Sequence, residues 1–294
     1  MNILLTGANG QVGREVAQLG RDAGHQVLAR GHGELDISDA AMVDGAVAND
    51  VGVVVNAAAY TAVDRAEQEP AAAFAVNRDG PAHLAAACRD RGIPLLHIST
   101  DYVFDGSKDG PYTEDDPAAP LGIYGQSKWE GEEAIRRRLE AHLILRVSWV
   151  FGIHGNNFVK TMLRLARERD ELRVVADQRG CPTYAAAIAA VLVGLVDRLA
   201  AGRPMHWGTF HYCGTPPTTW HGFAEAIVGQ GRGYEDLKAR RVAPIATADY
   251  PTPARRPANS VLDAARILRV YGVGPPPWRQ GLEHMLRALH AARS

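Results

Sequence analysis

The chain begins with the stretch Met1-Asn-Ile-Leu-Leu-Thr-Gly-Ala-Asn-Gly-Gln-Val-Gly13. Its apolar residues 3–5 predict a buried parallel strand, and a helical pattern starts near Gly13. Glycines stand at positions 7, 10 and 13 of this stretch. In a strand–turn–helix unit, the first glycine makes the tight turn, the second lets the backbone approach a pyrophosphate, and the third lets the helix pack closely on the strand. The stretch therefore predicts a dinucleotide-binding loop whose helix N-terminus faces phosphates.

Strands and helices alternate along the first half of the chain, which is typical of a parallel sheet with right-handed crossovers. We expect strands near residues 2–6, 26–30, 53–57, 94–99 and 143–147, with helices near 12–23, 39–48, 71–91 and 125–140. The later part predicts helices near 157–168, 185–199, 220–229 and 277–292, strands near 173–176 and 209–213, and a proline-rich ordered loop over 243–260. The predicted fold class is α/β.

The expected architecture is a Rossmann-type doubly wound parallel sheet with a smaller C-terminal substrate-binding lobe. We assign residues 1–155 with 182–215 to the dinucleotide-binding domain, and residues 156–181 with 216–294 to the smaller lobe. No repeat is visible in the sequence.

Bulk properties exclude several classes of protein. The net charge of −1 argues against nucleic acid as the main partner. The N-terminal apolar stretch is too short for a signal peptide, and the apolar helix near 185–196 is too short to span a membrane. The widely spaced Cys88, Cys181 and Cys213 indicate reduced thiols in a cytoplasmic protein. The histidines lack metal-ligand spacing, so no metal site is predicted.

The catalytic candidates are Tyr124 and Lys128 in the segment Tyr124-Gly-Gln-Ser-Lys128. At i and i+4 on a helix, the phenol and the ammonium share one face. A tyrosine with an ordinary pKa near 10 is a poor acid–base catalyst, and a neighbouring cation favours its phenolate. Such a tyrosine can exchange a proton with a carbonyl or alcohol oxygen. Thr100, at the end of a predicted strand, can donate a hydrogen bond to the same oxygen.

A second pair with this spacing, Tyr234 and Lys238, occurs late in the chain. It lies away from any predicted sheet edge, and we interpret it as a solvated helix face. Tyr124 is favoured because it starts a helix after a proline-rich loop and follows the strand that ends at Thr100.

These features together resemble the extended short-chain dehydrogenase/reductase superfamily and, within it, the dTDP-4-dehydrorhamnose reductase family. The residues that carry the resemblance are the stretches 2–13, 34–37, 55–64, 99–106, 124–128, 146–149, 155–158, 177–183 and 250–257. The resemblance implies reduction of the C4 keto group of dTDP-4-dehydro-L-rhamnose to dTDP-L-rhamnose. Hydride would come from NAD(P)H and the proton from Tyr124.

The resemblance also implies roles for single residues. The catalytic set would be Thr100, Tyr124 and Lys128, with Lys128 also bonded to the nicotinamide ribose. Cofactor-binding residues would be Gly7, Gly10, Gln11, Val12, Gly13, Arg30, Asp36, Ile37, Ala57, Ala58, Ala59, Asn77, Ser99, Tyr124 and Lys128. Substrate-binding residues would be Thr61, Val63, Thr100, Asp101, Tyr102, Tyr124, Trp149, Asn157, Lys160 and Arg256.

NADPH is the predicted cofactor, with NADH tolerated. A site that prefers NAD usually carries an acidic residue at the end of the second strand, where it binds the ribose diol. Here the segment reads Leu28-Ala-Arg-Gly-His-Gly33, and Arg30 or His32 can meet a 2′-phosphate. The alternative is that Arg30 points to solvent.

Some members of the family bind a divalent ion at a dimer interface through glutamates. Glu15 matches one of these positions, but Ala186 occupies the other. The resemblance therefore leaves a homodimer open without predicting the metal.

Four alternative functions remain open. A dehydratase of the superfamily needs an Asp-Glu pair after the strand-end threonine, whereas this chain has Asp101-Tyr102. An epimerase would keep its NAD and need a flexible sugar pocket. A reductase of a related dTDP-4-keto-deoxysugar would share every catalytic residue. A non-catalytic regulatory subunit that resembles the methionine adenosyltransferase β subunit is opposed by the intact Thr100, Tyr124 and Lys128.

Overall fold

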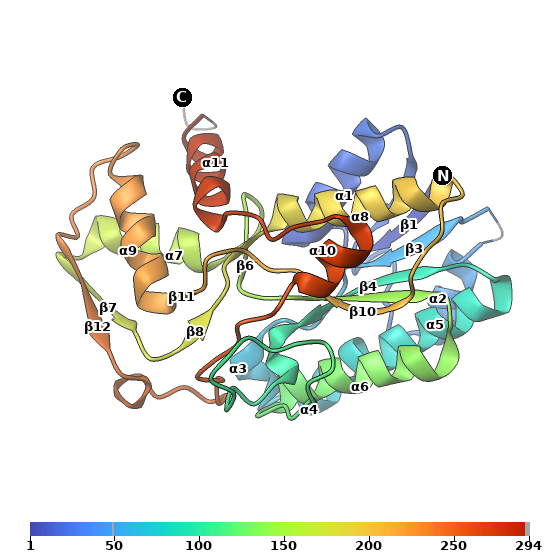
Figure 1. Cartoon of the computed structure of the whole chain (residues 1–294), viewed down its shortest axis with the longest axis horizontal. Coiled ribbons are helices and arrows are strands. Elements are labelled where there is room, and N and C mark those ends of the chain that lie inside the picture. Colours follow the sequence, from blue (N-terminus) through green and yellow to red (C-terminus); the bar gives the residue numbers. More distant parts are fainter. Residues whose placement is uncertain (49, 292–294) are drawn as a thin grey trace.

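A six-stranded parallel sheet forms the centre of the computed structural model, which describes residues 1–48 and 50–291 (Figure 1). The strand order is β10-β5-β4-β3-β1-β2, and every neighbouring pair is parallel. The strands are β1 (Asn2–Thr6), β2 (Gln26–Arg30), β3 (Val53–Asn56), β4 (Leu95–Thr100), β5 (His142–Val147) and β10 (Gly208–His211). The inner strands β1, β3, β4 and β5 are buried along almost their whole length because both faces are covered, whereas the edge strands β2 and β10 are partly exposed.

Helices cover both faces of this sheet (Figure 1). One face packs on α1 (Gln11–Asp22) and α8 (Ala185–Ala200), which also contact each other. The other face packs on α2 (Ala40–Ala46), α5 (Gly80–Arg91) and α6 (Ile123–Arg138). The predicted α/β fold class, a doubly wound parallel sheet, is confirmed.

The strand order reverses between β1 and β3, because β2 follows β1 on one side and β3 lies on the other. Doubly wound sheets bind their ligands at such a switch point, beyond the carboxyl ends of the strands. Gly7 stands there with φ of +67°, and a Cβ at this position would lie 2.4 Å from the Ala58 nitrogen. A Cβ at Gly13 would lie 2.2 Å from the Gly7 oxygen. The predicted tight turn and close helix packing are therefore confirmed.

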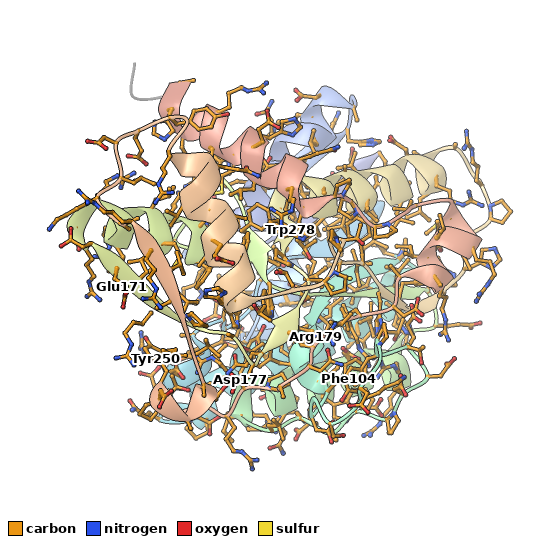
Figure 2. All side chains as sticks on the ribbon, turned by 60° about the vertical axis from the view of Figure 1, so that its left-hand side comes forward. Phe104, Glu171, Asp177, Arg179, Tyr250 and Trp278 are labelled. Carbon is orange, nitrogen blue, oxygen red and sulfur yellow. The ribbon has the colours of Figure 1, made fainter. Side chains whose placement is uncertain are left out.

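A smaller, separate hydrophobic core lies at the left of Figure 1. It contains side chains of α7 (Phe158–Glu168), β7 (Glu171–Val175), α9 (Trp220–Gly231) and α11 (Trp278–Ala291). Its largest fully buried side chain is Trp278, labelled in Figure 2. Short strand pairs border this core: β12 (Arg241–Ile245) with β7, β11 (Thr218–Thr219) with β8 (Arg179–Gly180), and β6 (Val150–Phe151) with β9 (Thr183–Tyr184). The domain boundaries at residues 155, 181 and 215 stay a prediction.

Several local predictions were wrong. The expected loop 243–260 begins inside β12, which pairs in parallel with β7. Pro244 argued against a strand there, but an edge strand tolerates a proline whose nitrogen faces away from its partner. The helix expected near 71–91 is present, but it contains a π-helical turn, η1 (Ala75–Asp79), between α4 (Pro70–Phe74) and α5. Residues 232–238, which carry Tyr234 and Lys238, form turns and coil instead of a helix.

Three short elements complete the described chain: α3 (Val63–Ala66), the 3-10 turn η2 (Asp101–Val103) and α10 (Ala265–Tyr271), with a further 3-10 turn η3 at Thr247–Asp249. Among the described residues, none of the helices has the length and apolar character needed to cross a bilayer.

A buried ion pair fixes α6 on the sheet. The Glu132 carboxylate accepts hydrogen bonds from Arg146 Nε at 2.9 Å and Arg146 Nη2 at 2.7 Å, and Arg146 lies on β5. Arg136 Nη2 donates to the same carboxylate at 2.6 Å, and Ser99 Oγ of β4 donates at 2.5 Å. Burial alone would raise the pKa of Glu132, but Arg146 and Arg136 lower it to about 2.

Replacing this carboxylate tests the anchor. Glu132→Gln should reduce the free energy of unfolding by about 3–5 kcal/mol, because it leaves the buried Arg146 without its charge partner. Since folding lowers the pKa of Glu132, its contribution is present above the ordinary pKa of 4.5 and is lost as the pH falls toward 2. Denaturant unfolding between pH 3 and 7 measures both effects.

The matched control is Glu133→Gln, whose carboxylate is partly exposed and pairs with Arg136 and Arg137. This change should reduce the free energy of unfolding by less than about 1 kcal/mol. Equal losses of unfolding free energy in the two variants would contradict the anchoring role of Glu132.

Candidate active site

The candidate active site lies where β4 ends and α6 begins. Thr100 ends β4, and its Oγ1 accepts a hydrogen bond from Tyr102 N at 3.2 Å and donates to Asp101 Oδ1 at 3.0 Å. The first turn of α6 is held from outside, since Ile123 N donates to Glu67 Oε1 at 2.8 Å. These contacts set the position of Tyr124, the second residue of α6.

Tyr124 is half-buried in a small hollow. Its ring meets the ring of Tyr102 edge-on, with centroids 5.6 Å apart. The hollow is lined by Val63, Glu67, Tyr102, Tyr124, Ala254 and Pro257, among other residues. Burial raises the pKa of Tyr124 to about 12, and a hydrogen bond with the Thr100 side chain opposes this rise. The phenol is therefore protonated at neutral pH, which is the state needed to donate a proton.

Lys128 lies one turn further along α6 and is almost fully buried. Its Nζ donates to Ile98 O at 2.7 Å and lies 3.3 Å from His97 Nε2. Burial lowers the pKa of Lys128 to about 8, and Glu132 opposes this shift. From the sequence we expect a neighbouring lysine cation to favour the phenolate of Tyr124. In the structure the pKa of Tyr124 is raised, because burial outweighs the opposing hydrogen bond with Thr100.

The glycine loop joins β1 to α1, with Gln11, Val12 and Gly13 in the first turn of α1. Gly10 is the N-cap and offers no side-chain cap. Gln11 connects this loop to the smaller core, because its Oε1 accepts a hydrogen bond from Asn157 Nδ2 at 2.9 Å. Asn157 in turn caps α7 by accepting from Lys160 N at 3.1 Å. The structure thus joins two sets of predicted residues, the loop and Asn157.

Ala57, Ala58 and Ala59 follow β3 and lie beside the glycine turn. Asn77, in the π-helical turn, fixes the backbone that comes next: its Oδ1 accepts from Tyr60 N at 2.9 Å and its Nδ2 donates to Tyr60 O at 3.0 Å. Asn77 Nδ2 also donates to Ser127 Oγ of α6 at 3.0 Å. Asn77 therefore ties the segment after β3 to the helix that carries Tyr124.

The end of β2 also reaches the glycine loop, because Ala8 N donates to Arg30 O at 3.0 Å. The Arg30 side chain is partly exposed and lies 3.5 Å from Glu34 Oε1. Asp36 accepts hydrogen bonds from the Ser38 nitrogen and hydroxyl at 2.9 and 2.7 Å, and these bonds lower its pKa. Ile37 is buried, and a Cβ at Gly80 would overlap it.

A long segment from residue 246 to 260 runs from the smaller core to the active site (Figure 2). Thr247 N donates to the Asp177 carboxylate at 2.9 Å, and Arg179 N donates to Ala258 O at 2.8 Å. Further along, Arg256 Nη2 donates to Asp64 Oδ2 of α3 at 2.8 Å. The segment thereby places the predicted Arg256 next to α3.

The remaining predicted substrate residues differ in their surroundings. Val63 lines the hollow at Tyr124, whereas Thr61 is exposed. Asp101 is buried, which raises its pKa to about 6 against the hydrogen bonds from neighbouring hydroxyls. The Ser99 hydroxyl is bonded to Glu132, as described above. The structure therefore gathers Thr100, Asp101, Tyr102, Tyr124 and Val63 at one place.

Trp149 and Lys160 make their contacts elsewhere. The Trp149 ring stacks on Trp220 with centroids 3.5 Å apart, and its φ is +46°. The Lys160 ammonium donates to Ile153 O at 2.6 Å and Gly155 O at 2.8 Å, so it closes the loop before α7.

Glu15 shows no ligand set around it. Its carboxylate lies 3.8 Å from His154 Nε2, and burial raises its pKa against the effect of His154. Within residues 1–48 and 50–291, no group of three or more His, Cys, Asp or Glu side chains is arranged to hold a metal ion.

Sequence reasoning missed several residues of the site. The buried His97 and Asn56 bond to one another and extend from Lys128 into the sheet, but within a buried strand their side chains carry no spacing signal. Glu67 was missed because its role depends on the first turn of α6, which is remote in sequence. The pairing of Glu132 with Arg146 could have been predicted from the sequence, because a charged residue on an otherwise buried element needs a partner of opposite charge.

Known proteins share this fold and sequence over nearly their whole length. The chain matches the family model described as RmlD substrate binding domain over residues 1–291. The dTDP-4-dehydrorhamnose reductase of Aggregatibacter actinomycetemcomitans is 46% identical over 96% of this chain and 97% of its own. A crystal structure of a dTDP-4-dehydrorhamnose reductase from Clostridium acetobutylicum has a TM-score of 0.91 at 36% identity, covering 98% of this chain and 99% of its own.

A second solved structure extends this likeness. The dTDP-4-dehydrorhamnose reductase of Bacillus anthracis, in complex with NADP, has a TM-score of 0.90 at 35% identity and covers 98% of this chain and 99% of its own. The matches span the sheet, the glycine loop and the smaller core alike. The chain therefore belongs to the dTDP-4-dehydrorhamnose reductase family.

Proposed function

We propose that this chain reduces the C4 keto group of dTDP-4-dehydro-L-rhamnose to give dTDP-L-rhamnose, with NADPH as reductant and Tyr124 as proton donor. The observation that carries the proposal is the meeting of Thr100, Tyr124 and Lys128 at the sheet edge beside a glycine loop. The names of relatives at up to 46% identity support the choice of substrate.

The glycine loop fits the phosphates of a dinucleotide. Gly7 and Gly13 leave no space for a Cβ, so the loop keeps its backbone close to the switch point. No side chain caps α1 at Gly10, so the first-turn N–H groups and the positive end of the helix dipole suit an anion. When bound, the cofactor supplies the hydride. NADPH is favoured over NADH because Arg30 stands at the end of β2, where a 2′-phosphate would lie.

The proton comes from this chain. Because burial raises the pKa of Tyr124, its hydroxyl stays protonated at neutral pH and can donate to the sugar oxygen as negative charge develops there. The Thr100 hydroxyl, which donates to Asp101 in the structure, would turn to donate a second hydrogen bond to that oxygen and so stabilise the same charge. Lys128, in its protonated form, stabilises the phenolate left on Tyr124.

The smaller lobe is proposed to hold the nucleotide diphosphate and sugar. Arg256, held against α3 by Asp64, brings a positive charge toward the hollow that Val63 and Tyr102 line. Asn157 and Lys160 shape the start of α7, and Trp149 stacks on Trp220. A homodimer and a cytoplasmic location stay predictions.

The deciding experiment is an assay in which the substrate is made in the same tube. dTDP-4-keto-L-rhamnose is generated in situ by the preceding dehydratase and epimerase, and loss of NADPH absorbance is followed. Oxidation that requires both added enzymes supports the proposal. NADPH binding without oxidation would favour a related keto-sugar, and retention of a synthetase without turnover would favour the regulatory alternative.

Replacing Tyr124 tests the proton donor. Tyr124→Phe should lower kcat by about 10²–10⁴-fold, because the general acid is lost, and should leave the affinity for NADPH nearly unchanged. Tyr234→Phe removes the phenol of the second Tyr-x-x-x-Lys pair and should retain wild-type turnover. Turnover and cofactor titration are measured for both variants, and an active Tyr124→Phe enzyme would remove the phenol from the mechanism.

Replacing Arg30 tests the cofactor preference. Arg30→Ala should raise KM for NADPH about tenfold or more, because a charge-assisted hydrogen bond to the 2′-phosphate is lost, while KM for NADH changes little. Arg21→Ala, on the last turn of α1, is the control for removing a nearby positive charge. Equal changes for the two cofactors in the Arg30 variant would reject the 2′-phosphate contact.

A further inference from the structure

A chain of fully buried polar side chains runs from Lys128 into the sheet. Lys128 Nζ lies 3.3 Å from His97 Nε2, and His97 Nδ1 lies 2.9 Å from Asn56 Nδ2. Asn56 Oδ1 accepts a hydrogen bond from Thr6 Oγ1 at 2.6 Å. Thr6, Asn56 and His97 are each 0% exposed, so these groups bond to one another instead of to solvent.

This network fixes which nitrogen of His97 carries the proton. Asn56 Oδ1 accepts from the Thr6 hydroxyl and also from Ala58 N at 3.0 Å, so the amide cannot be turned around. Asn56 Nδ2, a donor only, must then face His97. His97 Nδ1 therefore accepts, and in a neutral imidazole the proton sits on Nε2, which faces Lys128.

The Nε2–H group meets a lysine that has few acceptors around it. An ammonium has three donors, and its hydrogen bond among the described residues goes to Ile98 O. A donor on Nε2 repels an ammonium but can donate to the lone pair of an uncharged amine. Burial also lowers the pKa of Lys128 to about 8 and keeps that of His97 well below its ordinary value.

We infer that His97 is a positioning residue whose Nε2–H stabilises the uncharged form of Lys128. The charge one turn along α6 from Tyr124 is then set by proton uptake at the lysine, where a freely solvated lysine would be a permanent cation. The inference rests on the proposed function for its catalytic meaning. In reduction, the Tyr124 O–H bond breaks, an O–H bond forms on the sugar oxygen, and the phenolate left behind needs the protonated lysine.

Other charged groups on the elements packed against α6 do not take over this role. Glu132 would favour the ammonium, but Arg146 and Arg136 bind its carboxylate. Other titratable or charged groups on these elements include His142 on β5, Arg78 and Asp79 on η1, Asp101 and Tyr102 on η2, and those of α3 and α5: Asp64, Arg65, His83, Cys88, Arg89, Asp90 and Arg91. None of these has a hydrogen bond to Lys128 Nζ in the described part of the chain, so His97 is the titratable group in contact with it.

The first test measures the tautomer of His97 and the titration of Lys128 in the protein without substrate. In protein labelled with ¹⁵N-histidine, His97 should show the Nε2–H tautomer, assigned by loss of its signals in His97→Asn. In protein labelled with ¹³Cε-lysine, the Lys128 signal, assigned by its loss in Lys128→Met, should titrate well below an ordinary lysine. An Nδ1–H tautomer overturns the inference on wild-type protein alone, even if no variant folds.

The second test measures whether His97 shifts the titration midpoint of Lys128. His97→Asn keeps an acceptor for Asn56 but ends the contact with Lys128, so the Lys128 midpoint should rise by about one pH unit or more, a tenfold change in its proton affinity. His142→Asn removes another buried histidine that does not touch Lys128 and should leave the midpoint in place. A Lys128 midpoint that stays unchanged in His97→Asn contradicts the inference.

Turnover gives an independent readout. In the plot of kcat against pH, the alkaline limb should move to higher pH in His97→Asn, by the same amount as the titration midpoint of Lys128. A merely structural role would lower kcat at all pH values without moving the limb. If no keto-sugar is reduced at all, the proposed function fails while the two resonance measurements still decide the role of His97.

Discussion

The buried carboxylate of Glu132 is the contact on which the geometry of the active site depends. It binds Arg146 of β5 through two hydrogen bonds and receives the Ser99 hydroxyl of β4, so one side chain of α6 touches two neighbouring strands. A helix that packs only through apolar contacts can rotate or slide by small amounts. Bidentate charged hydrogen bonds have a fixed direction, and they hold α6 in one register.

That register decides where the reacting groups lie. Tyr124 and Lys128 stand two turns and one turn before Glu132, respectively, on the same helix face. Glu67 holds the first turn from outside and Asn77 holds Ser127, so the segment from residue 123 to 132 is fixed at its start, middle and end. Thr100 is placed independently, because it ends the strand next to Ser99. The contacts of α6 and β4 therefore place the three proposed catalytic side chains.

The sequence predicted the central part of this fold well, because glycine spacing and apolar strands are local signals. The strands from β1 to β5 and the helices that follow them lie close to their expected positions. Predictions failed where long-range pairing decides the local structure: β12 forms because β7 lies beside it, despite Pro244. The contacts of Lys160 with two loop carbonyls could not be predicted either, since they depend on how residues 152–157 turn.

The hydrogen bond between Gln11 and Asn157 has a thermodynamic consequence. It joins the first turn of α1, where a dinucleotide phosphate would lie, to the N-cap of α7 in the smaller core. If one ligand orders Gln11 or Asn157 when it binds, the second ligand finds both residues already partly ordered. By linkage, any gain in affinity that the cofactor confers on the sugar nucleotide must equal the gain that the sugar nucleotide confers on the cofactor. A single amide contact thus connects the proposed cofactor loop directly to the smaller core.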